Sequence, residues 1–252
     1  MRIATWNVNS LKVRLEHTQN WLQENQADVL CLQETKTEDN NFPLSQLQQA
    51  GYQVVFCGQK TYNGVAILSK MPISEAQYGL PNFEDPQKRL IAATVNGIRI
   101  VCVYIPNGES LESDKYQYKL AWLNALIHWL EDELRRYPKL AILGDFNIAP
   151  EDRDVHDPVA WTGKVLVSEP ERTAFQNMLK LGLRDSFRMF DQPEKTYSWW
   201  DYRMMGFRRN HGMRIDHILL SNALSCSACN IDKAPRKLER PSDHTPVWAD
   251  IG

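Results

Sequence analysis

Four short polar motifs stand beside strand-like apolar runs and are spread over almost the whole 252-residue chain. They are Thr5-Trp6-Asn7-Val8-Asn9, Leu32-Gln33-Glu34-Thr35-Lys36, Gly144-Asp145-Phe146-Asn147, and the late pair Arg214-Ile215-Asp216 with Ser242-Asp243-His244. Carboxylates, carboxamides and one imidazole at strand ends are the groups of a metal-assisted hydrolytic site. If folding gathers these motifs, they predict an enzyme that cleaves phosphodiesters.

The first two acidic motifs contain candidate metal ligands. Glu34 follows a buried-looking run, where a carboxylate is either an exposed edge residue or a ligand of a hard cation. Mg²⁺ binds one or two carboxylates and keeps waters and phosphate oxygens, so Glu34 helped by Asn7 suffices. Asp145 and Asn147 follow another apolar run, and on an extended segment they would face the same side. Each motif alone is weak, but together they indicate one site.

Composition narrows the class of protein. Hydrophobic residues make up 43% of the chain, which is ample for a core and excludes disorder. The net charge of −2 argues against binding nucleic acid through a global positive field, although basic loops beside an acidic site remain compatible with a nuclease. No run approaches the roughly 20 apolar residues that span a membrane. We therefore expect no membrane association.

The cysteines suggest a compartment. Their number is odd, and Cys31, Cys57 and Cys102 lie in apolar strand-like runs, which suits reduced, buried thiols in a cytoplasmic protein. Cys226 and Cys229 have the spacing of a zinc or redox pair. Without a second cysteine pair or a nearby histidine pair, a structural role is favoured.

The predicted elements describe a two-sheet fold. Strand-like runs lie at 2–8, 28–33, 52–57, 64–70, 90–96, 99–106, 139–144, 214–220 and 246–251. Asn96-Gly97 predicts a tight hairpin turn between two of them. Helices are predicted after an N-cap at Ser10, after Ser113-Asp114 with a Glu131–Arg135 pair, and over 168–181, where Ser168 and Glu171 form a capping box before Gly182.

The pattern of elements predicts an α+β fold. No repeat, low-complexity tract or linker interrupts the chain, so residues 1–252 are expected to form a single domain. Hairpin strands with a few separated helices favour sheet packed on sheet with helices outside. Regular β-α alternation and glycine-rich phosphate loops are absent, which speaks against a Rossmann sheet, a TIM barrel or a P-loop enzyme.

Taken in order, the motifs resemble the exonuclease III family of DNA-repair nucleases, in the endonuclease/exonuclease/phosphatase superfamily with deoxyribonuclease I. The resemblance covers residues 2–251 and includes Tyr104-Ile105-Pro106-Asn107 and the block 198–203. It implies a deoxyribonuclease I-like four-layer α/β sandwich of two packed mixed β-sheets flanked by helices. It also implies Mg²⁺-dependent hydrolysis, with Mn²⁺ as a substitute, of double-stranded DNA at 3′ ends or abasic sites. We expect a monomer.

The resemblance also implies roles for individual residues. Glu34 is the main metal ligand, with Asn7 close by, and the wider metal set is Asn7, Glu34, Asp145, Asn147, Asp243 and His244. His244 contacts the scissile phosphate and is oriented by Asp216. Asp145 positions or deprotonates the attacking water. The other catalytic candidates hold the water or phosphate or assist the leaving oxygen: Asn147, Tyr104 and Asn107.

Basic and aromatic residues mark the predicted DNA contacts. In residues 199–214, arginines that suit phosphate oxygens interleave with large apolar side chains that wedge into DNA. A solvated loop with its aromatic residues in the core is the alternative. The candidates are Lys36, Arg89, Trp199, Arg203, Arg208, Arg209 and Arg214, whereas Arg236, Lys237 and Arg240 are interpreted as surface charge.

The loop 148–163 bears on substrate choice. By resemblance it lies beside the DNA, and His156 and Trp161 add bulk as in relatives that favour 3′-end trimming over abasic-site incision. Two other functions compete with the nuclease. One is a phosphoinositide or sphingolipid phosphodiesterase of the same superfamily, which usually carries longer insertions and apolar membrane-facing loops. The other is a non-catalytic nucleic-acid-binding module, against which the intact Glu34, Asp145, Asp216 and His244 argue.

Overall fold

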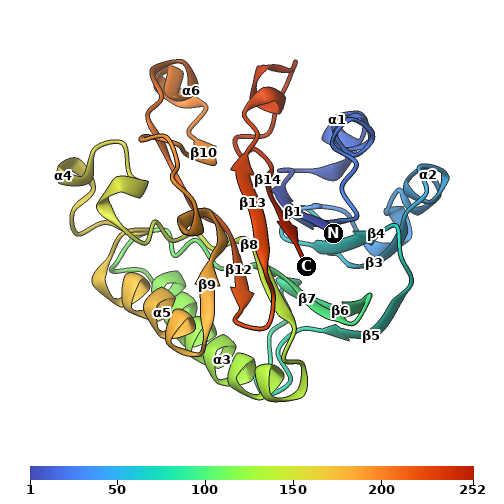
Figure 1. Ribbon diagram of the computed structural model, residues 1–252. Coiled ribbons are helices and arrows are strands. Elements are labelled where there is room, and N and C mark those ends of the chain that lie inside the picture. Colours follow the sequence, from blue (N-terminus) through green and yellow to red (C-terminus); the bar gives the residue numbers. More distant parts are fainter.

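The computed structural model describes residues 1–252 and contains two six-stranded mixed sheets (Figure 1). The helices are α1 (Leu11–Asn25), α2 (Leu44–Gln49), α3 (Asp114–Arg136), α4 (Pro158–Trp161), α5 (Glu169–Lys180) and α6 (Gly206–Arg209). The first sheet has the order β13 (Cys226–Ile231), β14 (Val247–Ile251), β1 (Arg2–Asn7), β2 (Val29–Gln33), β4 (Val65–Ser69) and β3 (Gln53–Cys57). The second has the order β5 (Ile73–Tyr78), β6 (Leu90–Val95), β7 (Ile98–Tyr104), β8 (Leu140–Asp145), β12 (Asp216–Ser221) and β9 (Leu183–Asp185).

Three apolar clusters hold four layers together. The largest lies between the sheets and joins residues such as Ile3 and Ile67 of the first sheet to Ile100 and Leu143 of the second. A second cluster packs α3 and α5 on the outer face of the second sheet, and a third packs α1 and α2 on the first (Figure 1). Burial of both sheet faces explains the continuous apolar runs in the central strands. The predicted four-layer α/β sandwich is confirmed.

In each sheet one parallel strand pair determines where polar residues meet. β1 runs parallel to β2 with Asn7 opposite Gln33, and β7 runs parallel to β8 with Tyr104 opposite Asp145. The carboxyl ends of these four strands therefore lie at one edge of the sandwich. A short two-stranded ribbon, β10 (Trp199–Trp200) and β11 (Gly212–Met213), stands above that edge.

Most predicted turns and caps are confirmed. Asn96 and Gly97 have φ values of 48° and 74°, as a tight hairpin requires, and Val95 pairs with Ile98. Ser113 accepts a hydrogen bond from Tyr116 N. The reciprocal capping box at the start of α5 and the left-handed glycine after its end are both present. The Glu131–Arg135 pair forms at 3.9 Å.

Two sequence predictions missed the local structure. Ser10 precedes α1 but makes no side-chain capping bond; its backbone N–H instead donates to Glu34 O at 2.8 Å, which ties α1 to the segment after β2. Strands β5 and β13 were not predicted because they are edge strands with several exposed polar residues, which leaves little apolar pattern. None of the helices has the length and hydrophobicity needed to cross a lipid bilayer.

The cysteine pair of β13 is structural. All five cysteines are free, and Cys229 is buried with its Sγ 3.3 Å from Ser186 Oγ. Burial raises the pKa of the Cys229 thiol to about 12, which keeps it protonated and unreactive at neutral pH.

Candidate active site

Asn7 joins two carboxylates from different sheets. It ends β1, Glu34 follows β2, and Asp145 ends β8. Asn7 Nδ2 donates to Glu34 Oε1 at 2.9 Å and to Asp145 Oδ2 at 2.8 Å, while its Oδ1 accepts from Asn9 N at 3.0 Å. The first two motifs and the third therefore meet across the sandwich, at the edge where the parallel strands end.

His244 completes this cluster from the far end of the chain. Its Nδ1 lies 2.9 Å from Asp216 Oδ2, and its Nε2 lies 3.6 Å from Asp145 Oδ2. Asp216 stands opposite Asp145 in the β12–β8 pair, and Ser198 Oγ donates to Asp216 Oδ2 at 2.6 Å. This geometry turns one imidazole nitrogen toward the Asp145 carboxylate and fixes the other on Asp216.

Charges in the cluster shift one another's pKa values. Burial disfavours a charged imidazole, but Asp216 and Asp145 outweigh it and raise the pKa of His244 to about 10. Burial, with the nearby Asp216 and Glu34 charges, raises the pKa of Asp145 to about 7 even though His244 opposes the shift. Burial and the Glu34 and Asp145 carboxylates raise the pKa of Tyr104 well above its ordinary value. At neutral pH the site therefore contains a charged imidazolium and a neutral phenol.

Three side chains come together at a candidate cation site, but only the two carboxylates can act as ligands while His244 is charged, because both nitrogens of an imidazolium carry protons. Ligand atoms of Glu34, Asp145 and His244 all lie within 4.8 Å of one another. Two carboxylates from separate strands are the oxygen ligands that hard cations prefer. The ammonium of Lys36 lies 2.8 Å from Glu34 Oε2 and supplies a positive charge beside this carboxylate. The donor set therefore fits a divalent cation.

Asn107 and Asn147 face each other beside this group. Asn107 Nδ2 donates to Asn147 Oδ1 at 3.0 Å, and Asn147 Nδ2 donates to Ile105 O at 2.9 Å. The expectation that Asp145 and Asn147 lie on one side of an extended segment is wrong. Asn147 has a left-handed φ of 50°, and its N–H donates back to Asp145 Oδ1 at 2.9 Å, which forms a turn. The turn still leaves both side chains at the site.

Asp243 and Arg214 depart from their predicted places. The Asp243 carboxylate accepts from Asn9 Nδ2 at 2.9 Å and Trp199 Nε1 at 3.0 Å, and it does not join the three-residue group. Arg214 is only 1% exposed and is paired with Asp154 at 2.7 Å and Asp185 at 2.8 Å. Its prediction as a DNA contact is wrong, because its guanidinium is buried and already paired with Asp154 and Asp185.

Of the other predicted DNA contacts, Arg89 and Trp199 touch residues of the site. Arg89 stacks on the Tyr104 ring at 4.7 Å and donates to Tyr104 O at 3.2 Å. Trp199 pairs through its backbone with His244. Arg203 is exposed and binds Asp201, whereas Arg208 and Arg209 are exposed and take part in none of the ion pairs. The side chains of Met204 and Met205 are 77% and 58% exposed at the tip of this loop.

Several residues at the site were missed or misread in the sequence. Arg236, interpreted as surface charge, is buried, packs over the rings of Trp200 and Phe207, and donates to Ser242 O at 2.5 Å. Lys119 is fully buried, and its Nζ donates to Asn147 O at 2.7 Å. Its only sequence signal is a lysine on the apolar stripe of α3, three residues after Tyr116. Ser198 stands in the tryptophan-rich block without a pattern that reveals its bond to Asp216.

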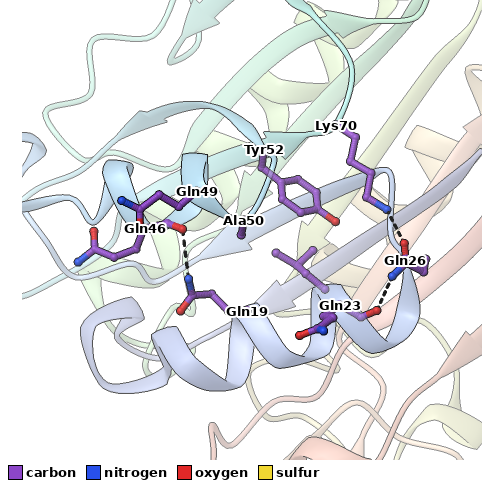
Figure 2. Close-up of a pocket in the computed structure, with 9 residues that line it drawn as sticks. Gln19, Gln23, Gln26, Gln46, Gln49, Ala50, Tyr52 and Lys70 are labelled. Carbon is purple, nitrogen blue, oxygen red and sulfur yellow. Dashed lines mark hydrogen bonds between the residues drawn. The ribbon is translucent and has the colours of Figure 1, made fainter.

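A groove elsewhere on the surface is chemically different. It encloses about 500 Å³ between α1 and α2 and is lined largely by glutamines (Figure 2). Gln19 Nε2 donates to Gln46 O at 3.2 Å and Lys70 Nζ to Gln26 Oε1 at 3.1 Å across it (Figure 2). No member of the acidic cluster lines this groove.

The fold agrees with comparisons to known proteins. The profile of the endonuclease/exonuclease/phosphatase family matches residues 4–244. The chain is 36% identical over 266 aligned positions to exodeoxyribonuclease III of Haemophilus influenzae, with all of both proteins covered. The 3′ phosphatase NExo from Neisseria, solved with a product DNA hairpin, matches with 49% identity and a TM-score of 0.98, covering 100% of this chain and 99% of that one.

A third relative widens the range of activities. An AP endonuclease from Archaeoglobus fulgidus matches with 41% identity and a TM-score of 0.95, covering 99% of this chain and 98% of that one. The chain belongs to the endonuclease/exonuclease/phosphatase family. Within it the chain is a hydrolase of the exonuclease III type, a DNA-repair nuclease. The relatives favour this function over a lipid phosphodiesterase or a non-catalytic binding module.

Proposed function

We propose that the protein removes nucleotides or blocking groups from the 3′ ends of duplex DNA with the help of Mg²⁺, and that Mn²⁺ can substitute. The observation that carries the proposal is the cluster of Glu34, Asp145 and His244, braced by Asn7 and Asp216. When bound, the cation supplies charge neutralisation for the phosphate. Glu34 is its main ligand in this proposal, and Asn7 holds Glu34 and Asp145 in place.

In this proposal, side chains of the site carry out the proton transfers and hold the phosphate. Asp145 orients the attacking water and takes its proton. Charged His244 donates from Nε2 to a phosphate oxygen while Asp216 fixes the ring through Nδ1. Asn147 holds the phosphate or water, and Tyr104, neutral because its pKa is raised, protonates the leaving oxygen with Asn107 nearby.

Preference for 3′ ends rests on the loop 148–163. Val155 bridges to Met213, Met213 pairs with Trp199, and Trp199 bridges to His244, so the loop connects to the catalytic histidine through β11 and β10. His156 stacks on His211 with ring centroids 4.9 Å apart. Two structural relatives, at 49% and 50% identity, are described as a 3′ phosphatase and a 3′-5′ exonuclease. Abasic-site incision is proposed as the weaker activity.

The setting of the reaction is also part of the proposal. The protein acts as a monomer, with residues 1–252 as one domain. Five free cysteines suit a cytoplasmic protein that repairs DNA with abasic sites or damaged 3′ ends.

A panel of duplexes tests this function. Duplexes with a recessed 3′ end, a 3′-phosphate or an internal abasic analogue are incubated with Mg²⁺, with Mn²⁺ and with chelator. We expect the first two substrates to be processed faster than the third, and chelator to stop all three reactions. Equal rates on the abasic duplex contradict the 3′ preference, and full activity in chelator contradicts the metal assignment.

A further inference from the structure

Three consecutive carbonyls follow the turn that carries Asn147, and each lies against a basic side chain from a different element. Asn147 O accepts from Lys119 Nζ of α3 at 2.7 Å, and Ala149 O accepts from Arg172 Nε of α5 at 3.1 Å. Between them, Ile148 O lies 2.8 Å from His217 Nε2 of β12. We call these carbonyls the carbonyl row. Backbone carbonyls seldom attract three such donors in succession, so the arrangement restrains this segment from three sides.

Lys119 makes the most complete set of these contacts. It is fully buried, and its Nζ also donates to Asn107 O at 3.1 Å and forms an ion pair with Glu171. All three ammonium protons therefore have an acceptor. Glu171 in turn accepts from Leu166 N at 3.0 Å. One ammonium thus fixes the main chain of both Asn107 and Asn147, whose side chains face each other at the site.

His217 acts as a neutral donor in this arrangement. Its Nδ1 lies 3.0 Å from Arg214 Nη1, and a guanidinium only donates hydrogen bonds. Nδ1 must therefore accept, and the proton resides on Nε2, which donates to Ile148 O. Burial, reinforced by the charge of Arg214, lowers the pKa of His217 well below its ordinary value. Arg214, held by its ion pairs, thus fixes His217, which in turn donates to Ile148 O next to the active-site turn.

These hydrogen bonds hold the main-chain conformation of Asn147. Its φ of 50° is a left-handed conformation, which asparagine tolerates better than most residues but which persists only where the surrounding structure holds it. A displacement of about 1 Å in a group that contacts the reacting atoms costs up to about 10²-fold in rate. The carbonyl row supplies the fixed main chain from which the Asn147 carboxamide projects.

We infer that Lys119 is a positioning residue of the nuclease reaction, which acts through the main chain of Asn107 and Asn147 and shares this role with His217 and Arg172. The inference rests on the proposed role of Asn147 in phosphodiester cleavage. Lys119 itself touches no reacting atom. Its substitution should therefore change the rate of the chemical step more than the affinity for DNA.

The test replaces the buried pair without leaving a lone charge. Lys119→Met combined with Glu171→Gln removes the ammonium and keeps acceptor oxygen for the Leu166 N–H. The matched control is Arg99→Met with Glu133→Gln. That pair is also buried, with a 2.8 Å contact, and involves the same helix α3, but Arg99 lies near the start of β7, at the end opposite Tyr104.

We expect the Lys119/Glu171 variant to lose about 10- to 100-fold in kcat, with KM for a recessed duplex changed by less than about threefold. The control should lose thermal stability and keep its kcat within about twofold. Equal kcat losses in both variants, or a normal kcat in the first, overturn the inference. A loss confined to KM also overturns it.

An Asn147→Ala background separates this inference from the proposed function. Asn147→Ala alone should lower kcat by about 10²–10³-fold, and adding the Lys119/Glu171 changes should then cost less than about threefold more. Normal activity of Asn147→Ala refutes the proposed function. A fully additive further loss leaves that function standing and refutes the positioning role.

If the Lys119/Glu171 variant does not fold, Arg172→Met decides the matter, since Arg172 is partly exposed and its loss leaves no buried charge. It should lower kcat about threefold at constant KM, and an unchanged kcat overturns the inference.

Discussion

The strand-end cluster and the loop 199–209 both present charge to a polyanion, but they hold it differently. In the cluster, Asn7, Asp145, Asp216 and His244 are buried and bonded to one another. In the loop, Arg208 and Arg209 are exposed and free of ion pairs. A preorganised site stabilises charge that develops at one fixed point, whereas exposed arginines neutralise phosphates at varying positions. We therefore assign phosphodiester cleavage to the cluster and DNA binding to the loop.

Removing a cluster residue should have the largest effect and tests the first half of this comparison. Glu34→Ala and His244→Ala should each lower DNA cleavage by about 10²–10⁴-fold, because each loses a positioned ligand or electrostatic group. Raised metal concentration should partly rescue Glu34→Ala, since Asp145 can share the ion, and should not rescue His244→Ala. Steady-state rates with circular dichroism as a folding control measure this, and near-wild-type rates refute the site.

The pairing of His244 with buried carboxylates should also appear as a pH-dependent stability in metal-free protein. The folded pKa of His244, about 10, exceeds the ordinary 6.5, so its contribution to stability is full below pH 6.5 and is lost as the pH rises toward 10. The folded pKa of Asp145, about 7, is also raised, so its ionisation lowers stability between about pH 4 and 7. Above about pH 7.5 the histidine dominates.

Urea unfolding between pH 7.5 and 10 measures this difference. The free energy of unfolding of the wild type should fall relative to His244→Gln by on the order of a few kcal/mol. Chelator is present in both samples so that no bound ion changes the titration. A constant difference between the two proteins across this range contradicts the charged state of His244.

The same contrast explains what the sequence could predict. Glu34 and Asp145 come at the carboxyl ends of strands whose apolar runs are unmistakable, so their meeting follows from strand direction. His244 precedes β14, which runs antiparallel to β1 and therefore begins where β1 ends. Arg214 and Arg208 have equal charge and similar neighbours in sequence. Only tertiary structure distinguishes them, because the carboxylates that form ion pairs with Arg214 lie 60 and 29 positions away in the sequence, at Asp154 and Asp185. Lys119 escaped notice for the same reason.

Removing two exposed arginines should have a smaller effect and tests the second half of the comparison. Arg208→Ala with Arg209→Ala should weaken duplex binding and lower the salt slope by roughly 0.9 for each lost phosphate contact. Fluorescence titration at several salt concentrations measures this. The matched control is Arg214→Met, which should destabilise the fold by about 3–5 kcal/mol because it leaves buried carboxylates unpaired.

At temperatures where it remains folded, Arg214→Met should bind duplex DNA with an unchanged salt slope. If the double alanine variant also keeps the wild-type slope, the loop is a solvated face and not a phosphate grip.

The smallest expected effect is in the loop 148–163, which belongs to neither region. An internal abasic site needs continuous DNA on both sides of the scissile phosphate, whereas a 3′ end needs it on one side. Bulk from His156, stacked on His211, should therefore obstruct the first substrate more. His156→Gly should raise incision at an abasic analogue severalfold and leave recessed-end digestion nearly unchanged.

The alternative is a local structural role for His156, since its Nδ1 lies 3.2 Å from Gly212 O and its backbone N–H donates to the same oxygen at 3.1 Å. His156→Gln separates the two, because it keeps a polar group and most of the bulk. If both variants lower both activities equally, His156 only stabilises its loop; if glycine alone raises abasic incision, steric bulk sets the preference.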